Sequence, residues 1–485
     1  MKTMSKNITV EKENGRVYTP NFIVNNILDL SGYHENNILK KHAIDNSCGD
    51  GAFLVEIVRR YCEEFLKHNT NILTLKEELE SFIHGIEIDV DECKKCRENV
   101  SAVAQSFGVD NVEWDIICAN TMDTNKYDGK MDFVLGNPPY VRVHHLGDSY
   151  SNIKQYEFAQ NGMTDFYIVF FEIGVKMLNK TGVLGYITPS SYFNSVAGSY
   201  MRNYLVHNDL LSRIVNLKHY QAFNATTYTA ITILQKGKTN SLIDYYQFDE
   251  KKLIPHYVDT LSSADYYLSG SFYFAKKEEL QRLKKIVFNL GVSDIAVKNG
   301  YATLCDPVFI NNFTIQSKYI IPVIKASTAT KKQIIFPYDD RGKLVSEDEL
   351  KTDNALYEYL QNNKESLCKR SIESTAHGCW YAFGRSQAIM DTYKDKMTIN
   401  ALVRDCTDLK MIDCPAGVGV YSGLYIISPS IPYEKIRQAI SSQEFISYIS
   451  LLGKYKSGGY YTYSSKDIKT YLNYVFAYEG GLIDE

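Results

Sequence analysis

The sequence predicts an α/β fold in which a doubly wound, mostly parallel sheet is followed by an α+β domain. Short apolar runs alternate with helical patterns through residues 1–240, which is the order of βαβ units. A glycine turn at residues 49–51 joins a strand to a helix, and a strand that ends at Gly136 stops in a rigid turn. Ligands of open α/β folds bind where the strands end, so these two turns mark the expected site.

The first elements are a capped helix and a strand, turn and helix unit. Thr19 is the expected N-cap of a helix over residues 21–28, with Pro20 as its first residue. A short strand follows at 42–45, then the glycine turn, and then apolar residues at helical spacing over 53–65. Such a unit brings backbone amides close to a nucleotide-like ligand, although a plain structural turn is the alternative.

Two further strands are predicted at residues 82–89 and 114–120. The first ends in carboxylates, and an acid at that position can accept hydrogen bonds from ribose hydroxyls. A charged segment at 74–80 lengthens the connection before it. The second strand ends at Asn120. Both strand ends are expected beside the glycine turn.

The fourth strand runs into Asn137-Pro138-Pro139-Tyr140. The Asn137 amide oxygen and the Pro138 carbonyl form two hydrogen-bond acceptors on a rigid backbone. They suit the NH2 group of a nucleobase, whose lone pair they would direct toward an electrophile. Tyr140 offers a ring on which the base can stack. The alternative is a tight turn without function.

Residues 141–240 are expected to complete the sheet. The loop 141–164 is long and polar, and its Arg142, His144, His145 and Lys154 favour surface or phosphate contact. Phe223 lies in a predicted turn, either as a hydrophobic plug or as part of the site. The remaining elements are helices at 165–178 and 201–205 and strands at 183–189, 213–217 and 229–234.

Composition limits the class of protein. The chain has 485 residues, 45% of them hydrophobic, and a net charge of −4, as in a soluble globular protein without a basic surface in bulk. No apolar run approaches about 18 residues and the N-terminus lacks a signal sequence, so we expect a cytoplasmic protein without a membrane partner. The ten cysteines are scattered, as free thiols would be. Cys93 and Cys96 lack a second metal-binding pair, so no metal is expected.

The C-terminal half is expected to hold the surface that contacts a polyanion. We place a catalytic domain at 1–240, a connector with a basic amphipathic helix at 241–290, and an α+β domain at 291–485. Of the 38 tyrosines, 24 follow residue 240. The segment 453–463 interleaves glycines, cations and aromatics, which favours phosphate contact and base stacking. The candidate contacts are Lys325, Lys331, Lys332, Arg370, Arg385, Arg404, Lys454 and Lys456.

Taken in order, these motifs resemble the gamma-class, TaqI-type adenine methyltransferases of DNA restriction–modification systems. That family has a Tyr-Thr-Pro segment, a glycine-turn cofactor loop, an acidic second-strand end, Asn-Pro-Pro-Tyr, and then a target-recognition domain. The specific motifs lie within 15–240, and the similarity is more diffuse at 321–325, 334–338 and 380–385. The resemblance implies a Rossmann-like, S-adenosylmethionine-dependent domain that methylates the N6 amine of a flipped-out adenine in double-stranded DNA.

The resemblance also implies the roles of individual residues. Tyr18 and Thr19 would hold the methionine end of the cofactor, and Glu87 would take its ribose hydroxyls. Where the family commonly has Asp, Asn120 offers the cofactor adenine an uncharged acceptor. The other implied cofactor contacts are Asp45, Ser47, Cys48, Gly49, Asn137 and Pro139. The implied catalytic residues are Asn137, Pro138 and Tyr140, and the implied DNA contacts are Tyr140, Phe223, Arg142, Lys454 and Lys456.

Several alternatives stay open. A protein glutamine N5-methyltransferase also uses Asn-Pro-Pro-Tyr, but does not need the long C-terminal half. The modification subunit of a multi-subunit restriction enzyme is a second alternative. That subunit carries a long helical region before its cofactor loop, whereas in this sequence Tyr18 comes almost at once. A catalytically inactive DNA-binding relative would not need residues 137–140 intact, and cytosine N4 is the competing acceptor. We expect a monomer, and a separate cognate restriction endonuclease is a candidate partner because few residues precede the Tyr-Thr-Pro segment.

Overall fold

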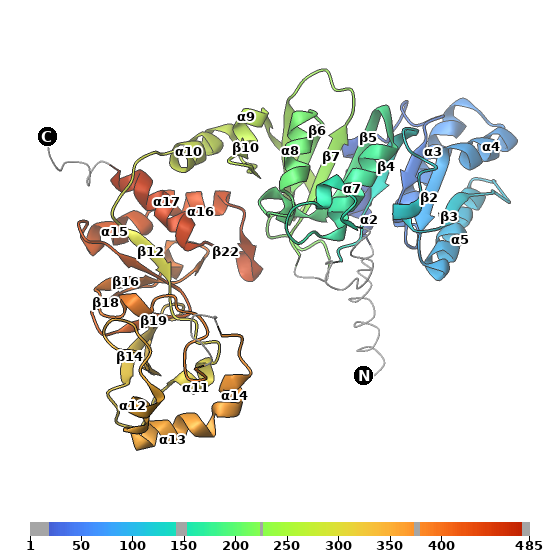
Figure 1. Cartoon of the computed structure of the whole chain (residues 1–485). Coiled ribbons are helices and arrows are strands. Elements are labelled where there is room, and N and C mark those ends of the chain that lie inside the picture. Colours follow the sequence, from blue (N-terminus) through green and yellow to red (C-terminus); the bar gives the residue numbers. More distant parts are fainter. Residues whose placement is uncertain (1–18, 142–152, 224–226, 373–378, 478–485) are drawn as a thin grey trace. The chain divides into compact units, whose positions relative to one another are not determined.

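The computed structural model describes residues 19–141, 153–223, 227–372 and 379–477. The chain divides into two compact units, Met1–Gln281 and Arg282–Glu485, which are described separately (Figure 1). No helix in the described ranges is long and apolar enough to cross a membrane.

The first unit is built on a nine-stranded sheet with the order β3-β2-β1-β4-β5-β7-β6-β8-β9. The five neighbouring strands β3, β2, β1, β4 and β5 are parallel to one another, whereas β7 is antiparallel to both of its neighbours, β5 and β6. The chain adds β2 and β3 on one side of β1 and β4 on the other, so the order reverses between β1 and β4. The strands are β1 Ala43–Asp45, β2 Ile83–Glu87, β3 Asp115–Cys118, β4 Met131–Gly136, β5 Leu178–Pro189, β6 Leu211–Asn216, β7 Thr229–Gln235, β8 Ile243–Asp249 and β9 Ile254–Leu261.

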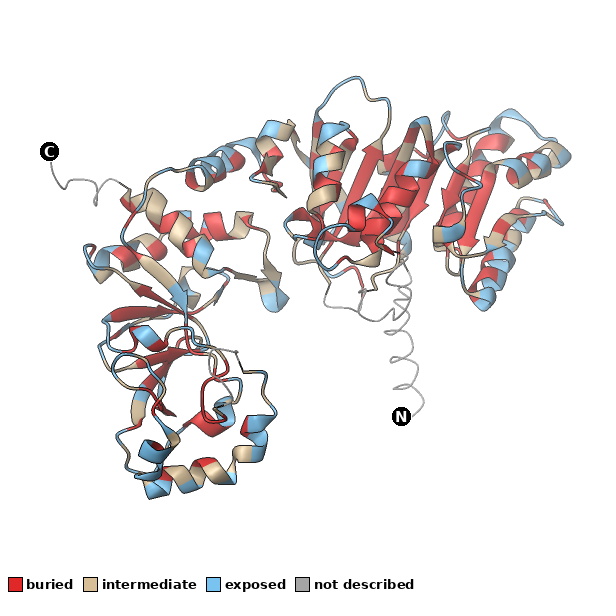
Figure 2. Ribbon diagram, in the orientation of Figure 1, coloured by how far each residue is buried: buried red, intermediate tan, exposed pale blue. Residues whose placement is uncertain are grey.

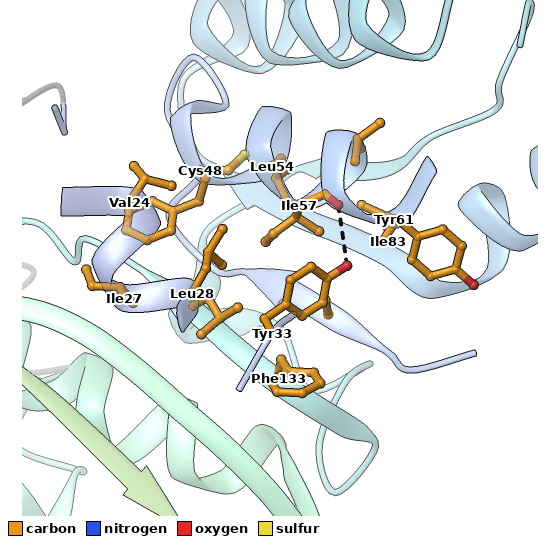
Figure 3. Packing of buried hydrophobic residues seen from close by; sticks show 14 of the residues in the cluster. Val24, Ile27, Leu28, Tyr33, Cys48, Leu54, Ile57, Tyr61, Ile83 and Phe133 are labelled. Carbon is orange, nitrogen blue, oxygen red and sulfur yellow. Dashed lines mark hydrogen bonds between the residues drawn. The ribbon is translucent and has the colours of Figure 1, made fainter. Parts of the chain in front are cut away.

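Helices pack on this sheet, and the strands that they cover are largely buried (Figure 2). Apolar side chains of α2 and α3 meet over β1 and β4 (Figure 3). Tyr33 links α3 to β4. Its ring lies edge-to-face on that of Phe133 with the centroids 5.2 Å apart, and its hydroxyl donates to the Ile57 carbonyl. The main helices are α2 Asn21–Ser31, α3 Ala52–His68, α4 Ile72–Phe82, α5 Val90–Ser106, α7 Phe166–Met177 and α8 Ser199–His207, followed by α9 Ser263–Tyr266. The division between the two units falls within α10 Lys277–Val287.

The predicted elements of this unit differ from the observed ones in a few places. Pro20, not Thr19, is the N-cap of α2. The segment 74–80 lies within a helix, α4, and β5 begins at Leu178, before Gly182. The sheet also continues past residue 240, where we placed a boundary, because β8 pairs with β6 and β9 with β8. The assignment of functions to the three segments stays a prediction.

The second unit is the α+β part, with two four-stranded sheets and a three-stranded one. Its largest core is rich in aromatic rings, with Phe336 and Phe383 beside Tyr301 and Tyr338. The sheets are β12-β20-β16-β18, β13-β15-β14-β19 and β17-β22-β21. Their strands are β12 Ala296–Asn299, β13 Ile310–Asn311, β14 Ile320–Lys325, β15 Thr330–Ile335, β16 Lys396–Ile399, β17 Leu402–Val403, β18 Met411–Cys414, β19 Gly419–Tyr421, β20 Leu424–Ile427, β21 Tyr455–Lys456 and β22 Tyr460–Thr462. The helices are α11 Asp306–Phe309, α12 Glu347–Lys351, α13 Asn354–Asn362, α14 Lys364–Cys368, α15 Tyr433–Ile440, α16 Gln443–Leu451 and α17 Ser465–Phe476.

Candidate functional site

The candidate site lies at the carboxyl ends of β1, β2 and β4, where the strand order reverses. Asp45 pairs with Gly85 across β1 and β2, and Ile44 pairs with Val134 across β1 and β4. This register brings the residues that follow the three strands to one edge of the sheet. In open α/β folds, that edge at the reversal point is where ligands bind.

The glycine turn after β1 depends on two glycines for different reasons. Gly51 has a φ of 96°, and a Cβ there would lie 2.9 Å from Cys96 Sγ. Gly49 has a φ of 52° with no atom near a Cβ, so backbone conformation alone favours glycine. Cys48, directly before Gly49, donates its N–H to the Ile86 carbonyl, and its side chain packs in the core. Only the backbone of Cys48 therefore remains for the predicted cofactor contact.

Glu87 at the end of β2 holds this loop in place. One carboxylate oxygen accepts from the Gly49 N–H and the other from the Asp89 N–H, both at 2.9 Å. Asp89 in turn caps α5 with its side chain. The residue expected to take ribose hydroxyls thus links the glycine loop to the start of the next helix.

Asp45 is buried beneath the loop, with an exposed fraction of 2%. Its carboxylate accepts from the Ser47 N–H at 3.0 Å. Burial, followed by the negative charges of Glu87 and Asp50, raises the pKa of this carboxyl to about 8. A Cβ on Gly136 would lie 2.6 Å from Asp45 Oδ1, so the last residue of β4 must be glycine for the carboxyl to fit. The sequence pattern marked Gly136 only as the end of a strand.

Asn137 is tied to two other predicted site residues. Its amide nitrogen donates to Thr19 Oγ1 at 3.1 Å, and its backbone carbonyl accepts from Ser47 Oγ at 3.4 Å. The Asn-Pro-Pro-Tyr turn therefore contacts both the glycine loop and the segment before α2. Pro138 is buried and Pro139 half-buried.

Tyr140 and Phe223 contact each other. Their rings are edge-to-face with centroids 5.9 Å apart, and the Tyr140 hydroxyl donates to the Ile187 carbonyl. Burial raises the pKa of Tyr140 well above its usual value. Phe223 belongs to the core cluster and is 7% exposed, as the hydrophobic-plug interpretation expects. A base stacked between the two rings would have to displace Phe223.

Asn120 caps the short helix η1, Thr121–Asp123. Its amide oxygen accepts from the Met122 N–H and its amide nitrogen donates to Asp123 at 2.8 Å. Both ends of the side chain are thus used within its own turn. A second lone pair of the oxygen is what remains for the predicted cofactor contact.

Comparison with known proteins finds a family that matches part of the chain. Residues 35–223 match the family described as Eco57I restriction-modification methylase. The chain is 24% identical to the Type II methyltransferase M.BstVI of Geobacillus stearothermophilus, covering 76% of this chain and 73% of that protein. It is 25% identical to the Type II restriction enzyme and methyltransferase RM.Eco57I of Escherichia coli, covering 79% of this chain but 48% of that protein.

The fold of this chain has solved counterparts. The Type IIL restriction-modification enzyme MmeI, solved in complex with DNA, superposes with a TM-score of 0.61 at 12% identity over 91% of this chain and 63% of MmeI. The Type ISP enzyme LlaGI, solved with a DNA substrate mimic, gives a TM-score of 0.52 at 13% identity over 85% of this chain and 41% of LlaGI. The predicted fold class, a doubly wound α/β domain followed by an α+β part, is confirmed.

The other predicted contacts have different outcomes. Tyr18 and Arg142, with His144 and His145, lie outside the described residues. Lys456 is exposed, whereas Lys454 pairs with Asp467. Cys93 and Cys96 are buried in α5, and the described residues contain no group of three or more His, Cys, Asp or Glu suited to a metal ion.

Arg370, one of the candidate polyanion contacts, uses its guanidinium within the second unit. Its guanidinium donates to the backbone carbonyls of Thr303, Trp380 and Ala382. Burial lowers the pKa of this guanidinium. Arg370 holds three backbone segments of the second unit together, and a sequence without contacts could not distinguish this role from a surface charge.

Proposed function

We propose that this chain is a site-specific DNA methyltransferase that transfers a methyl group from S-adenosylmethionine to the N6 amine of adenine in duplex DNA, as the modification enzyme of a restriction–modification system or as an orphan methylase. The observation that carries the proposal is the bond between Ser47 Oγ and the Asn137 carbonyl at 3.4 Å. It joins a turn suited to an aromatic amine to a loop suited to a nucleotide-like cofactor. The similarity to Type II methyltransferases supports the same reaction.

The residues of the loop fit S-adenosylmethionine. Gly49 and Gly51 keep side chains away from the loop, and Glu87 places a carboxylate at the end of β2. The Asp45 carboxyl is a suitable neighbour for the cofactor's ammonium group, because a nearby cation would favour its ionised form against burial. When bound, the cofactor supplies an electrophilic methyl group on a sulfonium.

The protein side chains would then position the target base. The amine of a base inside a duplex is inaccessible, so the adenine must leave the stack. Asn137 Oδ1 and the Pro138 carbonyl accept the two amine protons and direct the nitrogen lone pair toward the methyl group. Tyr140 stacks on the base. The methylated ammonium is acidic enough to lose its proton to water, so the mechanism needs no strong general base.

The DNA partner and the recognised sequence belong to the same proposal. MmeI and LlaGI were solved with DNA or a DNA mimic, and the likeness covers most of this chain. We assign sequence choice to the second unit, whose surface carries Lys456 and Arg404.

The test is the chemical identity of the product. The purified protein is incubated with S-adenosylmethionine and genomic DNA, and the DNA is digested to nucleosides for mass spectrometry. We expect N6-methyladenine from the wild type, and a single-turnover rate lower by orders of magnitude in Asn137→Ala with DNA affinity retained. The exposed Asn208→Ala is the matched control and should behave as wild type. N4-methylcytosine, or methylated protein glutamine without methylated DNA, would replace this proposal with one of the alternatives.

A further inference from the structure

The three-stranded sheet β17-β22-β21 presents cations and aromatic rings on an exposed part of the second unit. In β17 and β22, Val403 pairs with Tyr461 and Leu402 with Thr462. Arg404 directly follows β17 and is exposed. Its guanidinium carbon lies 4.6 Å from the ring centroid of Tyr460, the first residue of β22. The aromatic ring thus supports one face of the guanidinium.

Asp408 fixes one edge of the same guanidinium. Arg404 Nε donates to Asp408 Oδ2 at 3.1 Å, and Nη2 donates to Oδ1 at 3.3 Å. The Arg404 backbone N–H also donates to Oδ2 at 2.9 Å. Asp408 is the last residue of the short helix η8, Cys406–Asp408, which Asp405 caps. The side chain of Arg404 is therefore oriented before any ligand arrives.

The outer edge of the guanidinium remains available. Nη1 and the second proton of Nη2 form a pair of parallel donors, and no hydrogen bond among the described residues uses Nη1 of Arg404. The Arg404 side chain is 51% exposed, whereas that of Asp408 is 19% exposed. A planar pair of donors matches the O6 and N7 acceptors on the major-groove edge of guanine.

The opposite charges of Arg404 and Asp408 favour a base over a phosphate as the ligand of Arg404. Asp408 offsets the positive charge of Arg404, which weakens its attraction to a polyanion of any sequence but leaves its directional donors intact. Because the orientation is already fixed, contact costs little side-chain entropy. Arg437 makes an instructive contrast, since its donors are divided among Asp413, Glu434 and the Met411 carbonyl.

We propose that Arg404 reads a guanine in the DNA sequence that this protein recognises, with Asp408 and Tyr460 as the residues that position it. This inference rests on the proposed function, because it takes duplex DNA as the substrate. It adds a specificity-determining residue to the second unit. Lys456, which pairs with Tyr460 across β21 and β22, is assigned a phosphate contact on the same sheet.

The test separates binding from methylation. The full-length protein selects duplexes from a randomised library, and the enriched motif is compared with that of Arg404→Lys, which keeps the charge but loses the planar pair of donors. We expect the wild type to enrich a motif containing guanine, and Arg404→Lys to lose about ten- to a hundredfold discrimination at one guanine position. Asp408→Asn should weaken discrimination at the same position.

Two controls sharpen the result. Arg437→Lys should leave the motif unchanged, and Lys456→Ala should weaken binding to all sequences alike. An unchanged motif in Arg404→Lys, or no motif from the wild type, would overturn the base-reading role. A motif without any methylated product would instead count against the proposed reaction and leave the role of Arg404 standing.

Discussion

The amide nitrogen of Asn137 donates a hydrogen bond to the hydroxyl of Thr19, 3.1 Å away. Residues 118 positions apart in sequence thus fix the side chain that we assign to the target amine. With the nitrogen anchored, the amide oxygen is directed away from Thr19.

Thr19→Val removes the acceptor with little change in volume. We expect the single-turnover methylation rate to fall by about two- to tenfold, the value of one hydrogen bond of about 0.5–1.5 kcal/mol, because the amide loses its anchor. Thr19→Ser keeps the hydroxyl and should retain the rate. Equal rates for Thr19→Val and wild type, measured by rapid quench, would remove Thr19 from this positioning role.

Tyr140 should act through its ring more than through its hydroxyl. Tyr140→Ala removes the stacking surface, and we expect weaker capture of the extruded base by about 1–3 kcal/mol and slower transfer. Tyr140→Phe loses only the bond to Ile187 and should stay close to wild type. Fluorescence of 2-aminopurine at the target position reports base extrusion. If the Phe and Ala variants capture the base equally poorly, stacking is not the reason.

Glu87 should govern cofactor affinity. Glu87→Ala removes the acceptor of the Gly49 N–H and the proposed acceptor of the ribose hydroxyls, so we expect a higher Kd for S-adenosylmethionine by calorimetry. The control is Glu98→Gln on the exposed face of α5, which should bind as wild type. Wild-type affinity in Glu87→Ala would refute the ribose assignment.

Asp45 should make the ligand-free protein less stable as pH rises. The pKa of its carboxyl is 3.8 in an unfolded chain and about 8 in the folded protein, so between these pH values the unfolded state releases a proton that the folded state retains. That contribution to stability is full below pH 3.8 and is lost as pH rises through about 8. Asp45→Asn keeps an acceptor for Ser47 and should remove this loss, which thermal unfolding at several pH values measures.

Asp115→Asn is the control of opposite sign. Burial alone would raise the pKa of the Asp115 carboxyl, but the hydrogen bonds from Lys126 and His84 outweigh burial and lower it. The contribution of Asp115 to the stability of the folded protein is therefore present at neutral pH and lost on acidification. If the thermal stability of wild type and of Asp45→Asn changes with pH in the same way, the Asp45 carboxyl does not retain its proton in the folded protein.

The boundary of the catalytic part can be tested by truncation. A chain ending at Ala275 keeps β8 and β9, whereas one ending at Asn240 loses both and leaves β6, with the buried Ile214 and Val215, without its neighbour β8. We expect the longer piece to fold and bind S-adenosylmethionine without methylating a specific site, and the shorter one to be less stable. Site-specific methylation by residues 1–275 would contradict the division of labour.

Much of the first unit follows from local sequence. The strand ends near Asp45, Glu87 and Gly136 were predicted to within a few residues, because short buried runs end at glycine, proline or acidic residues. The continuation into β8 and β9 was missed, since their burial is partial and a polar break precedes them.

Contacts between distant residues could not be predicted in the same way. The fit of Gly136 against Asp45 depends on the register of two strands, and the pairing of Lys454 with Asp467 depends on a cap of α17. The structural role of Arg370 depends on its own segment meeting residues 303 and 380–382, which occurs only in the folded chain. Such features arise from tertiary packing, which no local pattern encodes.

The bond from the Gly49 N–H to Glu87 closes the loop with a contact that the chain itself supplies. The conformational entropy of these residues has then been spent before an encounter with a small molecule. Binding at such a rigid loop is expected to resemble docking to a finished surface, with an association rate set mainly by diffusion and access. Selectivity among related nucleosides would accordingly reside in how long each remains bound.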